Sequence, residues 1–582
     1  MSAPQRIIPI RREYNRWVAD QTLEDYALRF TAKAARRWSP ARVANTALGA
    51  ISFLALEAIG GTITLNYGYN NAVAAIMVVG ILIFLTGLPI SYYAAKYGVD
   101  MDLLSRGAGF GYIGSTITSL IYASFTFIFF AIEAVIMSLA LEMWLGIPLP
   151  IGYVISALAV IPLVTHGIKL ISQFQLITQP LWIAFQILPF VFIGFTNPDA
   201  LLDWRRFTGY QSESADTMNL ALFGASAAVV FSLVAQIGEQ VDFLRFLPEQ
   251  TKKNRWRWWT ALLCAGPGWV VLGVIKMLAG SFLAFLALQH EIPASKAAEP
   301  TQMYSVAFNY VFHSPELSIA MTALFVIVSQ LKINVTNAYA GSIAWSNFFS
   351  RLTHRHPGRV VWVVFNVLIA LLLMELGVFK ALEQILGLYA IVAIVWVGAL
   401  VADLVVNKPL GLSPKHIEFK RAHLYDVNPV GVGAMLIATI VSIVSYLGLL
   451  GPTLQALSSF TALVVAFVAA PIIALLTKGR YYLARPVTQP GDGSRQPIQC
   501  CVCALPFEPE DMAGCPAYAG PICSLCCSLD VRCGDRCKPH AALPQQLHGW
   551  LDHVLPEPAL NALTSRLGQY LSVFTMISAW GF

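Results

Sequence analysis

"NTALGAISFLALEAIGGTITLNYGYNN" (residues 45–71) is an apolar segment with one acidic residue, Glu57, near its middle. Its length suffices to cross a hydrocarbon core of about 30 Å, which takes roughly 20 helical residues. A carboxylate at that depth is costly to bury and usually serves a function. Gly60 and Gly61 lie three and four residues after Glu57 and lower the energetic cost of local helix unwinding. Irregular backbone inside a membrane is tolerated only where it lines a cavity. We therefore predict a membrane helix interrupted at a binding site; the alternative is a glycine-mediated helix contact with Glu57 bonded to a neighbour.

The rest of the chain has the composition of a membrane protein. Of its 582 residues, 57% are hydrophobic and 12% are charged, whereas a soluble domain has about 25% charged residues. We predict an all-α membrane protein with about twelve transmembrane helices. Their ranges are 44–67, 71–95, 110–144, 151–168, 174–196, 219–246, 259–289, 317–349, 360–378, 381–406, 429–450 and 455–478.

The charges give this arrangement an orientation. Lys and Arg gather in the connecting segments that lie on the same side of the membrane as the N-terminus, as is typical of cytosolic loops. Residues 1–43 hold nine Lys or Arg and no apolar core, so we interpret them as a basic cytosolic tail rather than an export signal. Both termini are then expected in the cytosol. The net charge of +6 is modest and does not indicate a nucleic-acid partner.

The sixth helix range repeats the theme of the first. "QIGEQ" (residues 236–240) places Gln236 and Glu239 inside an apolar run. Interrupted helices at corresponding places in two halves are typical of a transporter's central site, and the first and sixth helices are five apart, as two inverted five-helix repeats require. Farther along, we interpret Asp242 and Arg245 as an i,i+3 ion pair.

The eighth helix range carries amides on one stripe. Gln330, Asn334 and Asn337 share a face at helical periodicity. Amides both donate and accept hydrogen bonds, which suits a planar polar ligand such as a nucleobase. The alternative is hydrogen bonding between helices.

Three stretches resemble the purine–cytosine permeases, the nucleobase-cation-symport-1 transporters, over roughly residues 40–480. They are "GVDMDLLSRGAGFGYIGS" (98–115), "VDFLRFLPEQTKKNRWRWW" (241–259) and "INVTNAYAGSIAWSNFF" (333–349). The resemblance implies a five-plus-five inverted repeat of the leucine-transporter type, with substrate held between the first, third, sixth and eighth helices. The substrate-binding residues predicted on these grounds are Glu57, Gly60, Glu133, Gln236, Glu239, Gln330, Asn334 and Asn337.

One departure from that family concerns the coupling ion. Lys332 and Ile333 stand where sodium-coupled members would carry hydroxyl side chains. An ammonium cannot ligate sodium, yet it can substitute for the ion's charge. We predict that the protein uses no sodium at this position, and that Lys332 either titrates, because burial lowers the pKa of a lysine, or pairs with Glu57 or Glu133.

Nine of the ten cysteines lie in a short segment near the C-terminus. After a Pro- and Gly-rich linker (479–499), the pairs Cys500-x2-Cys503 and Cys523-x2-Cys526 match the spacing of a zinc site, and a cytosolic thiol cluster binds metal more often than it forms disulfides. A second site could use the other thiols, and the end of the segment also resembles iron–sulfur ligation. The predicted metal ligands are Cys500, Cys503, Cys515, Cys523, Cys526, Cys527, Cys533 and Cys537. Zinc is favoured, with an iron–sulfur cluster or a metal-free thiol cluster as alternatives.

The cysteine-rich module (500–540) resembles one found in bacterial sensor proteins, where it joins a permease-like membrane domain (here 44–478) to a histidine kinase or a nucleotide cyclase. Residues 541–582 have apolar residues at helical spacing and are predicted to form an amphipathic signalling or coupling helix. The resemblance implies a multi-pass protein of a bacterial inner membrane.

Three functions fit these features, and none is enzymatic, because no nucleophile–base arrangement or phosphate-binding loop occurs. The first is a permease-like sensor that binds a nucleobase-like solute in the lipid bilayer and relays a conformational change through the metal module to a cytosolic output domain or partner protein. The second is a secondary transporter, proton-coupled or uniport, with a regulatory tail. In the third, the thiol module senses metal or redox state and the membrane part is an anchor.

Overall fold

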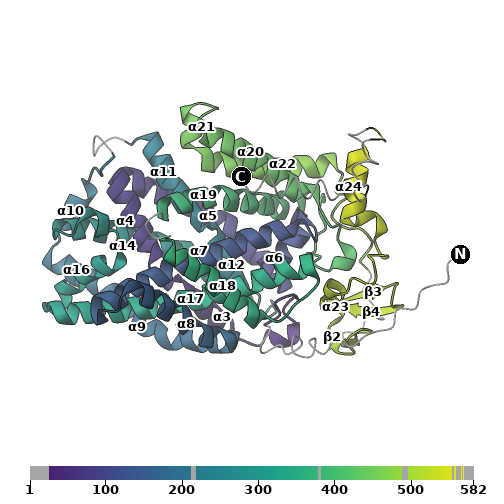
Figure 1. Ribbon diagram of the computed structural model, residues 1–582, viewed down its shortest axis with the longest axis horizontal. Helices are drawn as coiled ribbons and strands as arrows, with labels where there is room; N and C mark the ends of the chain where they lie inside the picture. The colour runs from purple at the N-terminus through teal and green to yellow at the C-terminus, as the bar shows by residue number, and fades with distance from the viewer. Residues whose placement is uncertain are drawn as a thin grey trace.

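The computed structural model describes residues 25–211, 218–377, 382–487 and 496–552, together with residues 556, 558, 565 and 568. A long bundle of helices makes up most of the molecule, and a small cysteine-rich unit lies at one end of it (Figure 1).

The first half of the bundle begins with a short N-terminal turn and ends with a long helix. Its elements are η1 (Lys33–Ala35), α3 (Pro40–Leu48), η2 (Gly49–Ser52), α4 (Ala55–Tyr67), α5 (Tyr69–Tyr97), α6 (Met101–Ser105), η3 (Arg106–Phe110), α7 (Ser115–Leu145), α8 (Leu149–Thr165) and α9 (Ile168–Thr196).

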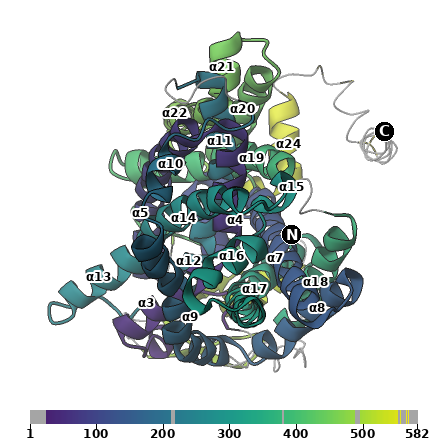
Figure 2. The ribbon, with the colours of Figure 1, turned by 90° about the vertical axis from the view of Figure 1, so that its left-hand side faces the viewer.

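The second half includes the longest helix, α17. Its elements are α10 (Ala200–Arg205), α11 (Leu220–Phe231), η4 (Ser232–Gln236), α12 (Ile237–Leu244), α13 (Arg255–Ala265), α14 (Trp269–Gln289), α15 (Ala294–Ala297), α16 (Pro300–Phe312), α17 (Pro315–Thr353), α18 (Arg359–Glu375), α19 (Leu382–Ala402), η6 (Asp403–Asn407), η7 (Arg421–His423), α20 (Pro429–Tyr446), α21 (Pro452–Ala456) and α22 (Ser458–Leu476). Helix α4 packs against α14, and α17 packs against α7 and α16 (Figure 2).

Membrane-spanning helices account for most of this bundle. Within the described ranges, nine helices are long and apolar enough to cross a membrane, or ten if the bent pair Pro40–Ser52 and Ala55–Tyr67 forms one span. Helices α8 and α18 lie where two further spans were expected, but each has only 17 residues. A multi-span helical protein is confirmed, and the count of twelve stays a prediction.

The first span is broken, but not where the sequence indicated. Its two parts are inclined by 44°, and the break lies at Phe53 and Leu54, where Phe53 is extended. The prediction that the helix unwinds at Gly60 and Gly61 was wrong, because both glycines lie inside the regular helix α4. A Cβ on Gly60 would collide with the carbonyl oxygen of Met277 on α14. The glycine therefore lets two helix backbones touch, as the alternative interpretation had it.

The sixth span changes its helical form without breaking. It runs from Leu220 to Leu244 as one membrane-length unit, in which Ser232–Gln236 tightens to a 3₁₀ turn between α11 and α12. A 3₁₀ stretch inside a helix often marks a hinge. The interruption expected in the sixth span is therefore limited to this 3₁₀ turn, and the helix continues through it.

The N-terminal segment, residues 25–39, packs between the bundle and the cysteine-rich unit. Its side chains Tyr26, Leu28 and Phe30 are buried. The bundle holds its backbone directly: Asn347 donates to the carbonyl of Ala27 at 2.9 Å. Of the predicted tail 1–43, the first 24 residues lie outside the described residues.

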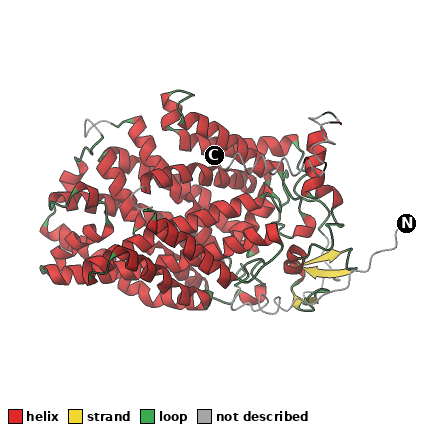
Figure 3. Ribbon diagram, viewed as in Figure 1, coloured by secondary structure: helices red, strands yellow, loops and turns green. Residues whose placement is uncertain are grey.

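The cysteine-rich unit is built from two short hairpins, two α-helices and two 3₁₀ turns, and its strands lie at one end of the helical bundle (Figure 3). Strands β1 (Ile498–Gln499) and β2 (Pro506–Phe507) pair antiparallel, as do β3 (Met512–Cys515) and β4 (Gly520–Cys523). The other elements are η8 (Pro509–Asp511), α23 (Ser524–Leu529), η9 (Pro539–Ala541) and α24 (Leu543–Asp552). Its core contains Met512 and Ile522 and takes in Leu28 from the N-terminal segment. Of the predicted helix 541–582, the part beyond α24 lies almost entirely outside the described residues.

Candidate substrate site and cysteine cluster

The amide stripe of α17 is buried and only partly satisfied. Gln330, Asn334 and Asn337 are all fully buried. The side-chain nitrogen of Asn337 donates to the side-chain oxygen of Asn334 at 3.2 Å. Both polar atoms of Gln330, the nitrogen of Asn334 and the oxygen of Asn337 have no hydrogen-bond partner among the described residues. A buried polar atom without a partner costs about 1–3 kcal/mol, so the stripe has unused capacity for a ligand that both donates and accepts.

The sixth span contributes a carboxylate with one unused oxygen. Gln236 donates to Oε2 of Glu239 at 2.8 Å. Oε1 of Glu239 has no partner in the part of the chain that the structure describes. Two of the predicted residues, Gln236 and Glu239, are thus in contact on the sixth span.

Glu133 caps the break in the first span. Its carboxylate accepts hydrogen bonds from the backbone N–H groups of Leu54, at 3.3 Å, and Ala55, at 3.2 Å. They belong to the N-cap residue and to the first residue of α4, and N–H groups at a helix N-terminus lack partners within the helix. An anionic cap at a helix N-terminus also interacts favourably with the helix dipole.

Glu57 forms a buried ion pair that sequence reasoning missed. Its Oε1 lies 3.2 Å from Nζ of Lys276 on α14. The same oxygen accepts hydrogen bonds from Gln186 at 3.2 Å and Tyr304 at 3.1 Å, while Oε2 has no partner within the described segments. Lys276 is the only lysine in the apolar run of residues 259–289, and that signal could have singled it out.

Lys332 does not pair with either glutamate. Its ammonium donates to the carbonyl and the side-chain oxygen of Gln175, at 3.2 and 2.7 Å, and to Thr178 at 3.1 Å. Both partners are on α9. In return, Gln175 donates to the carbonyl of Lys332 at 2.8 Å. Lys332 therefore joins α17 to α9. Of the two alternatives for this lysine, pairing with Glu57 or Glu133 is wrong, because Lys276 is the counter-charge of Glu57, and titration stays a prediction.

The expected i,i+3 ion pair of Asp242 and Arg245 does not form. Arg245 lies 3.4 Å from the carboxylate of Asp100 and donates to Tyr339 at 3.1 Å. Asp242 instead accepts a hydrogen bond from Tyr122 at 2.8 Å. Neighbouring helices offer both side chains closer partners than they offer each other.

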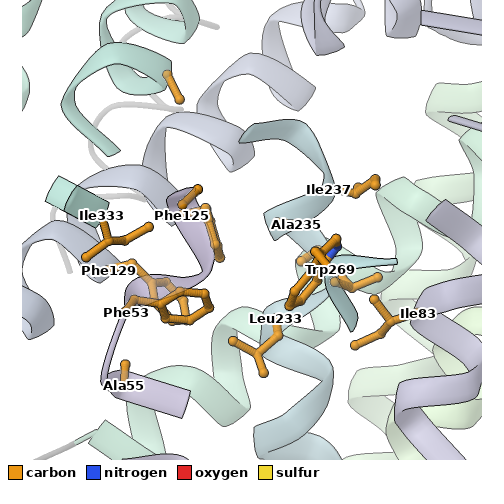
Figure 4. Close-up of a cluster of buried hydrophobic side chains, with 14 of the residues drawn as sticks. Phe53, Ala55, Ile83, Phe125, Phe129, Leu233, Ala235, Ile237, Trp269 and Ile333 are labelled. Carbon is orange, nitrogen blue, oxygen red and sulfur yellow. The ribbon is translucent and has the colours of Figure 1, made fainter. Parts of the chain in front are cut away.

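Apolar side chains stand beside the break. Phe53, at the break itself, and Phe125 and Phe129 of α7 point toward one another near Ile333 (Figure 4). The ring centroids of Phe125 and Phe129 are 4.4 Å apart, and those of Phe53 and Phe129 are 6.4 Å apart and edge-on. Small-molecule sites are usually lined by such groups, with a few polar atoms that fix orientation.

The family described as a permease for cytosine/purines, uracil, thiamine, allantoin matches residues 31–473. The chain belongs to this permease family. The match covers the helices that carry the amides and glutamates described above. It confirms the resemblance of the membrane domain to the nucleobase-cation-symport transporters, and it ends before the cysteine-rich unit, whose likeness to a sensor module stays a prediction.

Solved structures agree on the fold of the permease domain. Mhp1, described as a nucleobase-cation-symport-1 family transporter in a closed conformation with bromovinylhydantoin bound, has 16% identity and a TM-score of 0.57, covering 80% of this chain and 99% of its own. An inward-facing conformation of Mhp1 has 18% sequence identity and the same TM-score, and the match covers 79% of this chain and 97% of Mhp1. A Na⁺-coupled sialic acid symporter has 15% sequence identity and a TM-score of 0.50, and the match covers 79% of this chain and 94% of the symporter. Among curated proteins, none matches the chain.

Membership in the permease family decides between the functional hypotheses at a coarse level. The family consists of membrane transporters rather than enzymes, so a small-molecule substrate and a lipid bilayer are the supported partners. The sensor hypothesis gains no support from these comparisons, and the transporter alternative fits them better. The orientation of the termini and the bacterial origin stay predictions.

Four of the predicted metal ligands form a compact cluster. The sulfurs of Cys500, Cys503, Cys523 and Cys526 all lie within 4.8 Å of one another, and all four residues are buried. Backbone N–H groups point at these sulfurs: those of Val502 and Cys523 lie 3.4 and 3.3 Å from the sulfur of Cys500. Four convergent sulfurs suit a tetrahedral metal ion, and such N–H donors stabilise bound thiolates.

The other predicted ligands do not join this cluster. Cys515, Cys527, Cys533 and Cys537 lie near enough for their charges to interact, but within the described residues they do not converge as the first four do. Burial raises the pKa of the Cys527 thiol to about 12, against the opposing charge of Arg421. A second metal site stays a prediction.

Proposed function

We propose that the protein is a secondary transporter of a nucleobase or a related planar amide, with a metal-stabilised regulatory tail. The observation that carries this proposal is the group of buried polar atoms without partners on α17 and α12. A membrane domain that left these atoms unsatisfied throughout its cycle would be destabilised by each of them. A ligand with alternating N–H and C=O groups would satisfy both the acceptors and the donors.

In this proposal the ligand lies between the amide stripe and the phenylalanine group. Asn334 and Asn337 would bind its polar edge, and the free oxygen of Glu239 would accept an N–H. Phe53 and Phe129 would contact its faces. Mhp1, which shares the fold, binds a hydantoin derivative, and a hydantoin is a planar ring with amide groups of this kind. Gln330 and Gln236 complete the polar lining, while Glu57, Gly60 and Glu133 shape the first span beside it.

We further propose that Lys332 removes a need for sodium between α9 and α17. Its side-chain nitrogen is already held by three oxygens from α9, and in its charged form it would supply a positive charge there without a bound ion. Uptake should then be equal in sodium and potassium buffers. A transport rate that rises with sodium concentration would contradict this part of the proposal.

For the tail, we propose that the four-cysteine cluster binds zinc, with an iron–sulfur cluster as the alternative. Zinc would fix the two turns that carry the cysteine pairs and so order the hairpins around them. Because the adjacent residues 507–511 hold the N-terminal segment, the metal would also stabilise the contact of the tail with the bundle. Elemental analysis for zinc and iron separates the two metals.

The transport proposal is tested by uptake into proteoliposomes. Purified protein is first screened by thermal shift with purines, pyrimidines and hydantoins, and the stabilising compound is then supplied in labelled form. We expect saturable uptake that falls at least tenfold in Asn334→Ala, because one charged or amide partner is worth about 1–3 kcal/mol to a buried ligand. The control is Asn309→Ala, at an exposed position on α16. Stabilisation without any uptake would favour the sensor function instead.

A further inference from the structure

We propose that Lys276 acts as a built-in cation at the break of the first span and positions the two parts of that span for transport. The inference rests on the proposed transport function and assigns a positioning role to a residue outside the predicted ligand set. It follows from the way in which the two ends of the break are satisfied.

A break inside a membrane helix leaves carbonyl groups at one end and N–H groups at the other without partners. Glu133 satisfies the N–H end, at Leu54 and Ala55. Lys276 satisfies the carbonyl end, because its ammonium donates to the carbonyl oxygen of Ser52 at 3.2 Å. Each end thus has a side chain of complementary charge, and both side chains come from other helices.

The ammonium of Lys276 also reaches the second part of the span. It lies 3.2 Å from Oε1 of Glu57, which is in the first turn of α4. The ring of Trp182 on α9 lies 5.2 Å from the same nitrogen, a distance suited to a cation–π contact. Unwound backbone carbonyls are groups with which transporters of broken-helix type coordinate a cation, and the Glu57 carboxylate adds a negative charge beside this one. Here a tethered ammonium takes that position.

The packing around Lys276 determines which contact can change. A Cβ on Gly280 would collide with the backbone of Glu57, and one on Gly60 would collide with that of Met277. Helices α4 and α14 are therefore in backbone contact at two places beside the ion pair, and we infer that they move as one body. Ser52 belongs to the other part of the span. If that part swings during transport, the contact of Lys276 with Ser52 is the one that opens and closes.

The test uses uptake into proteoliposomes by Lys276→Ala, Lys276→Arg and the control Lys296→Ala, which alters an exposed lysine on α15. Removal of the ammonium leaves the Ser52 carbonyl without its side-chain donor and Glu57 without its counter-charge. We expect the maximal uptake rate of Lys276→Ala to fall about tenfold or more, with a smaller change in KM. Methylammonium in the buffer should restore part of that rate, and Lys276→Arg should retain more activity than Lys276→Ala. The control should match the wild type.

Two outcomes would overturn the inference. One is a Lys276→Ala rate equal to that of the wild type. The other is a loss that neither methylammonium nor arginine relieves, since a purely structural lysine would behave in that way. If the single variant does not fold, the double variant Glu57→Gln/Lys276→Met replaces it, because it leaves no unpaired charge. In this double variant the substrate should still raise the melting temperature, while the maximal uptake rate falls. A maximal uptake rate equal to that of the wild type would refute the positioning role of Lys276.

The comparison also separates this inference from the function on which it rests. Absence of uptake by the wild type and by every variant would refute transport itself. Wild-type uptake with no difference among the Lys276 variants would refute only the positioning role.

Discussion

Replacement of Arg29 should release the N-terminal segment from the cysteine-rich unit. The guanidinium of Arg29 lies 2.9 Å from the carboxylate of Asp511, and the exposed fractions of the two side chains are 6% and 0%. The same guanidinium lies over the ring of Phe507, 4.2 Å from its centroid. In Arg29→Met the Asp511 carboxylate stays buried, and among the described residues the hydroxyl of Ser524 is the one side-chain donor left to it.

The size of the effect follows from this burial. Removal of one partner from a buried ion pair costs about 3–5 kcal/mol, because the other charge is left without compensation. The segment and the unit share a second pair, Lys33 with Glu510, at 2.6 Å, but its side chains are 42% and 38% exposed. Such a pair contributes about 1 kcal/mol at most. Since 1.4 kcal/mol corresponds to about tenfold, Arg29→Met should raise the open population by about a hundredfold to a few thousandfold, and Lys33→Met should raise it by less than about tenfold.

Hydrogen exchange on the purified protein measures these populations directly. Protection should fall for residues 25–36 and 507–515 in Arg29→Met and change little in Lys33→Met. The double variant Arg29→Met/Asp511→Asn removes both charges and should recover most of the loss. An equal loss of protection in the two single variants would refute the reasoning, because burial would then not determine the strength of the contact.

Three further predictions concern other contacts. Burial raises the pKa of Glu418, but hydrogen bonding from His423 and the charge of Lys420 outweigh it and lower the pKa to about 2 from 4.5. This carboxylate therefore stabilises the fold above about pH 4.5 by up to about 3 kcal/mol, and it loses that contribution as the pH falls toward 2. The difference in melting temperature between Glu418→Gln and the wild type should therefore narrow between pH 6 and pH 3. A difference that stays constant over this range would contradict the prediction. Elemental analysis should find a metal that Cys523→Ser loses and that Cys264→Ser, the control at an exposed cysteine, retains; equal metal in both variants would exclude the cluster as its site. Finally, Gly280→Ala should lower the melting temperature, because the new Cβ would collide with the backbone of Glu57 and overpacking costs about 1–3 kcal/mol. The control is Gly194→Ala, which has open space around the new Cβ. Equal melting temperatures of the two variants would argue against backbone contact between α4 and α14.

Local spacing was enough to predict part of the site. The two Cys-x2-Cys pairs each fit within one turn of chain, and they converge as the spacing indicated. The amides of α17 follow helical periodicity over two turns, and they are buried on that helix as expected. In both cases the sequence separation within each element already determines the geometry.

Contacts between distant segments could not be predicted in the same way. The break at Phe53 and Leu54 carries no glycine or proline, so propensity does not mark it. It depends on Glu133 and Lys276, which lie about 80 and 220 positions further along the chain. The docking of Arg29 on Asp511 spans 482 positions. A single sequence shows that such charges exist but not which of them meet.

The partners that the structure supplies also rank the predicted substrate ligands. A side chain can bind a solute only through atoms that the protein has not already engaged. Both oxygens of Glu133 accept backbone N–H groups of the first span, and Oε1 of Glu57 accepts three donors. Gln330, in contrast, has both of its polar atoms free within the described part of the chain, and Asn334 has a free nitrogen. We therefore expect Glu57 and Glu133 mainly to shape the proposed site, and the amides of α17, together with the free oxygen of Glu239, to contact the solute.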